Sequence, residues 1–376
     1  MIALRHGRIL LDDGFAEGCA VLIDEGRIVA VVPDSDARVA NAQAVDLKGG
    51  MLLPGFLDTQ VNGGGGVLFN EAPTVDTIRR IGEAHRRFGT TGFLPTLISD
   101  DLSVIASAMG SVREAIAARV PGVIGVHIEG PYISAERKGA HDAAKFRDLD
   151  ARGVELLASL GVGRTLVTLA PEGTNAETIR LLSRRGVTIS AGHTNATWEE
   201  MQESFAHGVR GVTHLYNAMS PLNHREPGVV GAALLDPRCW CGLIVDGRHV
   251  HPAALQVALR CKPPDRLVLV TDAMPTVGGD SDSFMLQGRR ITVVNGVCVD
   301  ENGTLAGSAL DMATAVRNCV DMLDLPIEQA ARMASTWPAE FLGLGHELGR
   351  IAPGYRASLT LMDENLRVTR TWIDGR

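Results

Sequence analysis

Ionisable side chains follow several short apolar runs in the middle of this sequence, where the strands of a parallel sheet would end. Three of them are a carboxylate and two imidazoles: Glu129, His193 and His214. These are the ligand types that a catalytic divalent metal with an open coordination position requires. A lone histidine at a strand end is more often an ordinary hydrogen-bonded residue. The joint occurrence of the three residues favours a metal site instead.

Two more polar residues end the next strand-like runs, Asp272 and His249. A carboxylate opposite a metal can take a proton from water and deliver it to a leaving nitrogen, so Asp272 is the candidate general acid and base. A helix N-cap is its alternative role. His249 could donate to a substrate carbonyl and share the negative charge that develops there. A purely structural histidine is the alternative in that case.

Two loops carry weaker signals. Gly63–Gly66 permits unusual backbone angles and close approach of a ligand, although four glycines alone describe only a flexible loop. Arg225 could hold a phosphate through two parallel hydrogen bonds, with an ordinary surface arginine as the alternative. For both loops the two interpretations stay open at this point.

Strand-like runs alternate with helical segments through the middle of the chain, which indicates β-α units around a parallel sheet. Eight such units favour a closed (β/α)8 barrel, whose catalytic residues lie at the carboxyl ends of the strands. The predicted strands are Gly55–Val61, Gly92–Leu97, Val123–Ile128, Thr165–Leu169, Val187–Ala191, Gly211–Leu215, Gly242–Val245 and Leu267–Thr271. Helices are predicted over Val75–Phe88, Leu102–Arg119, Ala176–Arg185 and Trp198–His207.

Both ends of the chain have a different texture from the middle. Short alternating runs between turn-forming residues predict antiparallel strands, and hence a small composite β-sandwich built from both termini. We therefore expect an α/β protein, with the sandwich formed by residues 1–50 and 346–376 and a TIM-like barrel formed by residues 51–345. A β-hairpin inserted near 284–299 and helices over 308–323 and 327–342 complete the prediction.

Composition limits the classes of partner and compartment. The 376 residues include 36 Lys+Arg and 44 Asp+Glu, a net charge of −8, and no basic run, so neither nucleic acid nor a membrane surface is an expected partner. The six cysteines contain no C-x-x-C pair, which predicts buried free thiols in a reducing compartment. Without a signal-like apolar region or a run of about 18 apolar residues, a cytoplasmic location is expected.

A series of short motifs resembles, in order, those of bacterial N-acetylglucosamine-6-phosphate deacetylases of the amidohydrolase superfamily. The motifs are Pro54–Asp58, Gly63–Gly66, His127–Tyr132, Lys138–His141, Ala191–Thr194, Thr213–Met219, Arg225–Gly228, Thr271–Met274 and Leu305–Ser308. The resemblance implies a barrel with a small sandwich and a metal-activated hydrolysis of N-acetylglucosamine 6-phosphate to glucosamine 6-phosphate and acetate. Such a reaction belongs to amino-sugar catabolism or cell-wall recycling.

The resemblance also implies a homodimer and a role for individual residues. It implies the same three metal ligands, and the same roles for Asp272 and His249, as the residue types suggest. His141 is similar to the family residue that contacts sugar hydroxyls. The implied phosphate-binding residues are Asn217, Ala218 and Arg225, with the arginine reaching in from the other subunit of the dimer.

One departure from the wider superfamily concerns the number of metals. Gln60 and Asn62 stand where many amidohydrolases carry the H-x-H motif that helps to bind a second ion. Amide side chains are poorer ligands than imidazole for a borderline cation, and a subset of these deacetylases with Gln-x-Asn uses one metal. We expect one divalent ion per subunit, with Zn²⁺ as the expected metal and Fe²⁺, Co²⁺ or Mn²⁺ as alternatives.

A cyclic amidase, another amino-sugar deacetylase and a non-catalytic binding protein are the alternatives to this function. A cyclic amidase with two metals commonly uses a carboxylated lysine on its fourth strand, and Thr165–Glu172 contains no lysine. Deacetylation of another amino-sugar phosphate, such as N-acetylgalactosamine 6-phosphate, stays open because the two sugars differ at one hydroxyl. A non-catalytic binding protein could use the same barrel, but Asp272 beside a complete ligand set counts against it.

Overall fold

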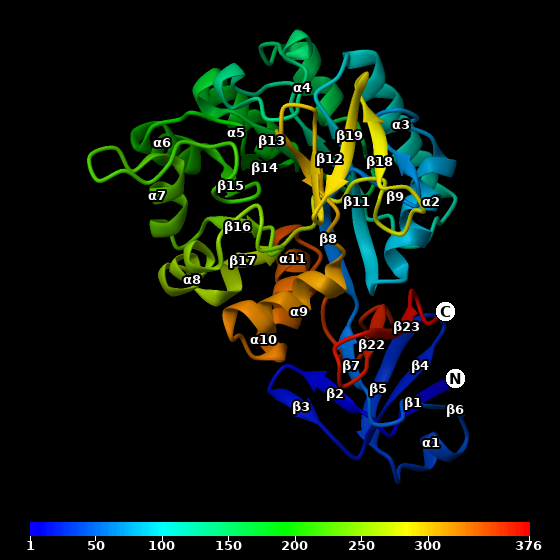
Figure 1. Cartoon of the computed structure of the whole chain (residues 1–376). Helices are drawn as coiled ribbons and strands as arrows, with labels where there is room; N and C mark the ends of the chain where they lie inside the picture. Colours follow the sequence, from blue (N-terminus) through cyan, green and yellow to red (C-terminus); the bar gives the residue numbers. More distant parts are fainter.

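A row of parallel strands forms the centre of the computed structural model, which describes residues 1–376 (Figure 1). The strands are β8 (Phe56–Val61), β11 (Thr90–Ile98), β12 (Gly125–Glu129), β13 (Arg164–Leu169), β14 (Thr188–Ala191), β15 (Val209–Val212), β16 (Trp240–Leu243) and β17 (Leu267–Leu269). Their order in the 8-stranded sheet is β17-β16-β15-β14-β13-β12-β11-β8. A parallel bridge from Val61 to Ala273 joins the two ends of the row, so the sheet is nearly closed. The predicted barrel is confirmed.

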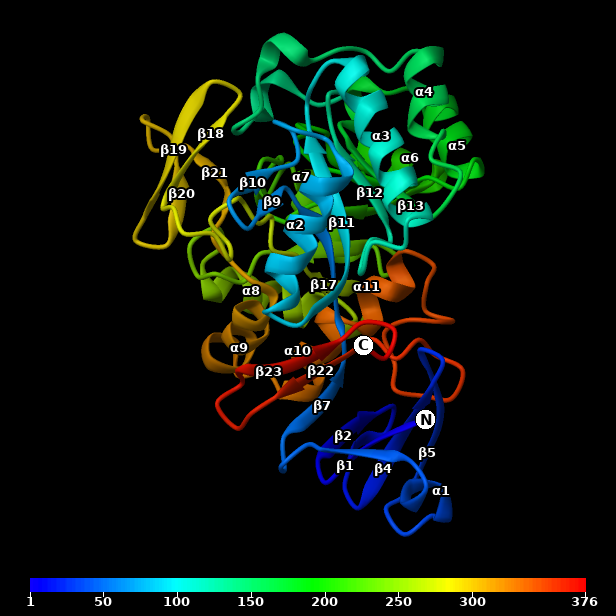
Figure 2. The same ribbon diagram turned by 90° about the vertical axis from the view of Figure 1, so that its right-hand side faces the viewer.

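Helices cover the outside of the barrel (Figures 1 and 2). In α2 (Val75–Arg86) the buried residues recur at intervals of three and four, so one face of the helix packs inward. A capping box between Thr197 and Glu200 begins α6 (Trp198–His207). The other barrel helices are α3 (Leu102–Ala117), α4 (Ala151–Leu157), α5 (Ala176–Arg184), α7 (Gly228–Leu235), α8 (Pro252–Cys261), α9 (Met312–Leu323), α10 (Ile327–Ala334) and α11 (Thr336–Phe341).

Strands from both ends of the chain build the smaller β-rich domain below the barrel in Figure 1. The strands are β1 (Ile2–Arg5), β2 (Arg8–Leu11), β3 (Gly14–Ala16), β4 (Cys19–Asp24), β5 (Arg27–Pro33), β6 (Gln43–Asp46), β7 (Met51–Pro54), β22 (Leu359–Met362) and β23 (Val368–Trp372), with the short helix α1 (Ala37–Ala40) before β6. They form sheets in the orders β5-β4-β1-β6 and β23-β22-β7-β2-β3. The second sheet therefore combines both ends, as the fold prediction expected. The residue boundaries given for the domains stay a prediction.

An antiparallel sheet follows β17 and projects from one side of the barrel (Figure 2). Its strands are β18 (Ser283–Leu286), β19 (Arg289–Val294), β20 (Val297–Val299) and β21 (Leu305–Ser308). The segment predicted as a hairpin, 284–299, thus supplies three strands of a four-stranded sheet. Gln287, in the turn between β18 and β19, holds the sheet to the barrel, because its Nε2 donates to the Ser99 carbonyl at 2.7 Å.

The Gly63–Gly66 segment consists of the short strand β9 (Gly63–Gly64) and the tight turn Gly65–Gly66, which leads into β10 (Val67–Leu68). A side chain at Gly63 would place its Cβ 2.5 Å from the Val67 carbonyl oxygen, and Gly65 has a φ of +60°. The turn therefore needs glycine for its own backbone path. It does not line the main cavity described below.

All six cysteines are free, as predicted; Cys19 is partly buried, Cys261 is exposed and the other four are buried. None of the helices combines the length and the apolar character that a membrane span requires.

Candidate active site

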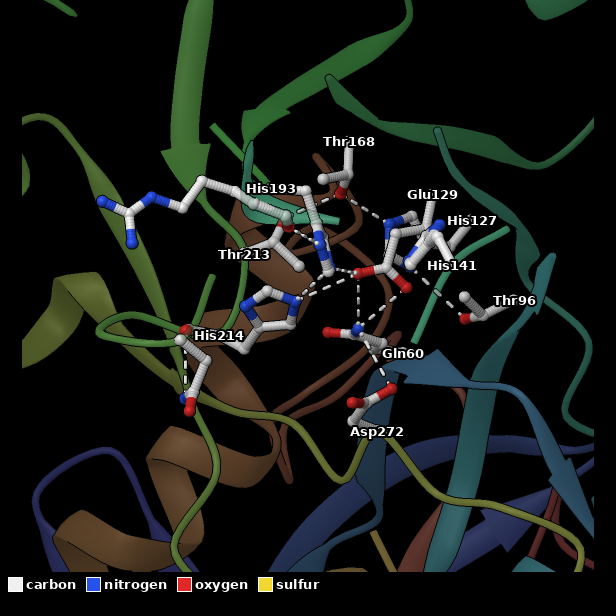
Figure 3. Close-up of polar contacts among 12 residues, drawn as sticks. Gln60, Thr96, His127, Glu129, His141, Thr168, His193, Thr213, His214 and Asp272 are labelled. Atoms are coloured by element: carbon white, nitrogen blue, oxygen red, sulfur yellow. Dashed lines mark hydrogen bonds and ion pairs between the residues drawn. The ribbon is translucent and has the colours of Figure 1, made fainter. Parts of the chain in front are cut away.

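Glu129, His193 and His214 converge at the carboxyl ends of β12, β14 and β15, with Glu129 the last residue of its strand and each histidine two residues past the end of its own (Figure 3). Oε1 of Glu129 lies 3.3 Å from Nε2 of His193 and 3.1 Å from Nε2 of His214, and the two Nε2 atoms are 3.1 Å apart. Ligand atoms about 2.0–2.2 Å from a tetrahedral zinc ion stand roughly 3.3–3.5 Å from one another. The three buried side chains therefore fit a divalent cation, and the chain holds no other group of this kind.

A hydrogen bond orients His193, and unusual backbone angles place both imidazoles. The Nδ1–H of His193 donates to the Arg137 carbonyl at 2.8 Å, which leaves Nε2 for the cluster. His193 and His214 have φ values of +48° and +33°, and Asp272 has +53°. Side chains other than glycine seldom adopt this left-handed region, and such strain is concentrated at functional sites.

Asp272 lies beside the Glu129 cluster and is linked to it through Gln60 (Figure 3). Oδ1 of Asp272 accepts hydrogen bonds from Asn62 Nδ2 at 2.6 Å and from Gln60 Nε2 at 3.2 Å. Gln60 Nε2 also lies 3.1 and 3.2 Å from the two oxygens of Glu129. Gln60 is thus a neutral donor between the two carboxylates, and Asn62 is a second neutral donor to Asp272. The pKa of Asp272 is raised to about 6, mainly by burial and in second place by the negative charge of Glu129. This value is suited to proton transfer near neutral pH.

His249 is oriented by a carboxylate in the same loop. Its Nδ1 lies 2.6 Å from Oδ2 of Asp246, and the other carboxylate oxygen accepts the backbone N–H groups of Arg248 and His249 at 2.8 Å each. Burial would raise the pKa of Asp246, but the bond from His249 and these backbone donors hold it below its usual value. Asp246 is therefore ionised, and it accepts the Nδ1–H of His249, which fixes the orientation of the imidazole.

We expect Asp246→Asn to lower kcat by about 10- to 100-fold, the usual scale for removing a partner of an active-site imidazole. Asparagine keeps the oxygen that caps the loop but loses the charge. The measurement is kcat, KM and metal content, with Asp236→Asn as the matched control, because Asp236 caps Arg238 in the same way outside the main cavity. An unchanged kcat would show that the loop orients His249 without Asp246.

His141 has a defined tautomer, because Nδ1 accepts the backbone N–H of Ser99 at 3.3 Å and lies 2.7 Å from the Ser99 hydroxyl. A backbone N–H can only donate, so the proton of the neutral ring is on Nε2. The pKa of His141 is held well below its usual value, mainly by burial and in second place by the neighbouring His193. The ring is therefore a neutral hydrogen-bond donor, 4.4 Å from the ring of His193 between centroids.

A cavity of about 380 Å³ joins these groups, a size within the usual range for small-molecule sites. It brings together the predicted residues Glu129, His141, His193, His214, Asn217, Ala218, His249 and Asp272. Ile98, Ile244, Met274, Leu286 and Leu305 add an apolar wall, in part from the β18–β21 sheet. Gln60 and Asn62 are buried and do not line the cavity themselves. Arg225 is exposed on the loop between β15 and α7, outside the lining of this cavity.

Sequence reasoning gave no role to several residues that support the site. Ser99 and Arg137 hold His141 and His193, and no local pattern marks them because their partners are distant in sequence. His127 shares its strand face with Glu129, and its Nε2 lies 2.8 Å from the Thr168 hydroxyl. Burial lowers the pKa of His127 to about 4, so it is neutral. Its two-residue spacing from Glu129 was a usable signal.

Residues 51–376 match the model of the amidohydrolase family. The chain belongs to this family. The amidohydrolase is 42% identical to N-acetylgalactosamine-6-phosphate deacetylase from Shewanella sp. (strain ANA-3), over 100% of this chain and 95% of that one. It is 36% identical to N-acetylglucosamine-6-phosphate deacetylase from Vibrio furnissii, over 99% and 94% of the two chains. The predicted family resemblance is confirmed.

Solved structures agree with this placement. The crystal structure of N-acetylglucosamine-6-phosphate deacetylase from Pasteurella multocida superimposes with a TM-score of 0.96 at 36% identity, covering 100% of the amidohydrolase and 98% of that chain. A mutant of the enzyme from Mycobacterium smegmatis, in complex with N-acetyl-D-glucosamine-6-phosphate, gives 0.91 at 32% identity with the same coverage. The family is metal-dependent, and the Glu129, His193 and His214 cluster could hold the ion.

Proposed function

We propose that this amidohydrolase removes the acetyl group from N-acetylglucosamine 6-phosphate, giving glucosamine 6-phosphate and acetate. The observation that carries the proposal is one cavity lined both by a cluster that could hold a metal ion and by a separate carboxylate, Asp272. Hydrolysis of an unactivated amide needs both an activated water and a proton for the departing amine. Relatives at 36% identity over nearly the whole chain bear the name of this activity.

Glu129, His193 and His214 are proposed to hold one divalent ion, with Zn²⁺ as the expected metal. When bound there, the ion supplies Lewis-acid chemistry that makes water a nucleophile at neutral pH. A single ion is proposed because Gln60 and Asn62 already satisfy the carboxylates with neutral amide donors. Imidazoles at those positions would have offered ligands to a second ion.

The proton movements are assigned to this chain's own residues. Asp272 takes the proton of the attacking water and delivers it to the departing amine nitrogen. His249 donates from Nε2 to the amide carbonyl oxygen, where negative charge develops. His141 donates from Nε2 to a sugar hydroxyl, which orients the ring. The apolar wall around these groups limits water in the cavity and strengthens each of these contacts.

Asn217 and Ala218 are proposed to bind the phosphate, completed in a homodimer by Arg225 from the other subunit. We expect Arg225→Ala to raise KM for the phosphorylated sugar at least about tenfold, because a charge-assisted bond of about 1.5–3 kcal/mol is lost. Activity on the unphosphorylated sugar should change little. Steady-state kinetics on both sugars make the comparison, and an equal loss on both would mean that Arg225 is structural.

Acetate release from three sugars tests the proposed function. N-acetylglucosamine 6-phosphate should be hydrolysed with a higher kcat/KM than N-acetylgalactosamine 6-phosphate, and both should exceed unphosphorylated N-acetylglucosamine. No acetate from any of the three, with the metal replete, would refute the proposal.

Deacetylation of N-acetylgalactosamine 6-phosphate is the second candidate function. A specific observation favours it, since the Shewanella relative named for that activity is 42% identical, against 36% for the Vibrio relative. The same assay decides between the two epimers by their ratio of kcat/KM.

A cytoplasmic location is proposed as well, supported by six free cysteines.

A further inference from the structure

The cavity is poor in cations for a site that would take a phosphorylated sugar. Three carboxylates line it, Glu129, Glu136 and Asp272, whereas Arg137 is the only arginine or lysine in its lining. A dianionic phosphate placed among carboxylates needs a cation nearby. Within one chain, Arg137 is the residue that could supply it.

The guanidinium of Arg137 is held in place and yet free to bind. Its Nε donates to Oδ1 of Asn195 at 3.0 Å. Asn195 is fixed in turn, because its Nδ2 donates to Glu136 at 2.7 Å and its backbone N–H donates to Glu172 at 2.6 Å. The two terminal nitrogens of Arg137 make no hydrogen bond or ion pair within the chain. They form the planar fork that binds two phosphate oxygens at once.

The anchor of Arg137 adjoins the segment proposed to bind the phosphate. Thr194, the residue before Asn195, donates its backbone N–H to the Ala218 carbonyl at 3.1 Å and forms a parallel bridge with Met219. Arg137, Asn217 and Ala218 line the same cavity. Through Asn195, the guanidinium is therefore connected to the segment at Thr194 that bonds to Ala218 and bridges Met219.

We propose that Arg137 is a specificity-determining residue that binds the phosphate of the substrate from within the same subunit. The identity of the substrate rests on the proposed function; the anion contact itself does not. Arg225 lies outside the lining of this cavity in the single chain, so Arg137 gives each subunit a phosphate contact that does not depend on the dimer.

The backbone carbonyl of Arg137 contacts His193, whereas its guanidinium is proposed to bind phosphate, so the two roles can be tested separately. The carbonyl of Arg137 accepts the Nδ1–H of His193, so a structural disturbance at this position would lower metal content and activity on every substrate. Loss of the guanidinium alone should affect only phosphorylated ligands. Metal content and the unphosphorylated sugar therefore separate the two cases.

The test compares Arg137→Gln with Lys138→Gln, which removes the same charge from the next residue, an exposed lysine that does not line the cavity. Arg137→Gln should raise KM for the phosphorylated sugar and Ki for inorganic phosphate at least tenfold, whereas Lys138→Gln should change both less than about twofold. Arg137→Lys, which keeps one charge without the fork, should recover part of the loss.

Three outcomes would overturn the proposal: equal effects of Arg137→Gln and Lys138→Gln, an equal loss on both sugars, or loss of metal from Arg137→Gln. If wild-type protein deacetylates none of the sugars, the proposed function fails separately. Calorimetric titration with inorganic phosphate then still tests Arg137, since the wild-type protein should bind phosphate at least tenfold more tightly than Arg137→Gln. Equal affinities in that titration would exclude the contact.

Discussion

Asp272→Asn should lower kcat by at least about 10²-fold while metal and substrate binding survive, because general acid–base catalysis contributes on this scale. Asparagine keeps the size of the side chain and an oxygen that can still accept from Asn62, 2.6 Å away in the native protein. It cannot take a proton from water or pass one to the amine. Both halves of the proposed reaction should therefore slow together.

Turnover, metal content and substrate affinity are measured on one preparation of the Asp272→Asn variant. Asp311→Asn is the matched control, because Asp311 is the N-cap of α9, where asparagine caps as well as aspartate, and it does not line the cavity. Near-normal turnover of Asp272→Asn would refute its role. Loss of metal together with activity would instead make Asp272 a ligand.

Replacing His193 or His214 with alanine is expected to remove most of the bound metal and nearly all activity. Two of the three predicted ligands would remain, and metal affinity depends on a complete set. Elemental analysis of the native protein should find one equivalent of divalent metal per chain. A chelator should abolish activity, and the added ion should restore it in the native protein but not in the variants.

His207→Ala provides the comparison for those variants. His207 is partly exposed at the end of α6, where Nδ1 lies 2.6 Å from the Glu203 carbonyl, and it does not belong to the ligand cluster. Its replacement should leave metal content unchanged. Two full equivalents per chain in metal-replete protein would contradict the single site, and a His193→Ala variant that keeps its metal would exclude His193 as a ligand.

The strands were predictable because a buried parallel strand leaves a continuous apolar run in the sequence, with polar residues where it ends. The predicted positions of the strand ends were less accurate. His214 was predicted inside a strand over Gly211–Leu215, but β15 ends at Val212 and His214 has a left-handed φ of +33°. The periodicity of apolar residues does not show where the backbone leaves the extended conformation and so changes the direction of a side chain.

The helical segment predicted over Ile327–Leu342 is two helices, and the physical reason lies in its own sequence. Pro338 has no N–H to donate to the carbonyl four residues earlier, that of Ala334, where α10 ends. The Ser335 hydroxyl donates back to the Ala331 carbonyl at 2.6 Å, a bond that competes with helix continuation. The proline was the usable signal for this break.

Five residues of the cavity were predicted from strand ends, because strands of one barrel bring their carboxyl ends to one face: Glu129, His193, His214, His249 and Asp272. His141, Asn217 and Ala218 were predicted only through the family resemblance. The partners that support these residues were not predicted. Ser99 contacts His141 only in the folded chain, and Arg137 contacts Asn195 in the same way. The spacing of these residues in the sequence therefore does not indicate either pair. Asp246 differs, since it stands three residues before His249, and that local spacing could have indicated the pair.

The pairing of β7 with β22 has a consequence for how the protein folds during synthesis. Leu52 and Leu359 share one apolar cluster, and Pro54 is in register with Leu359, although the whole barrel sequence separates them. Contacts between distant segments form late, so the β5-β4-β1-β6 sheet and the pairing of β7 with β2 can form on the ribosome before β22 is synthesised. A chain that stalls before Leu359 would present β7 as an unpaired edge, open to pairing with other nascent chains.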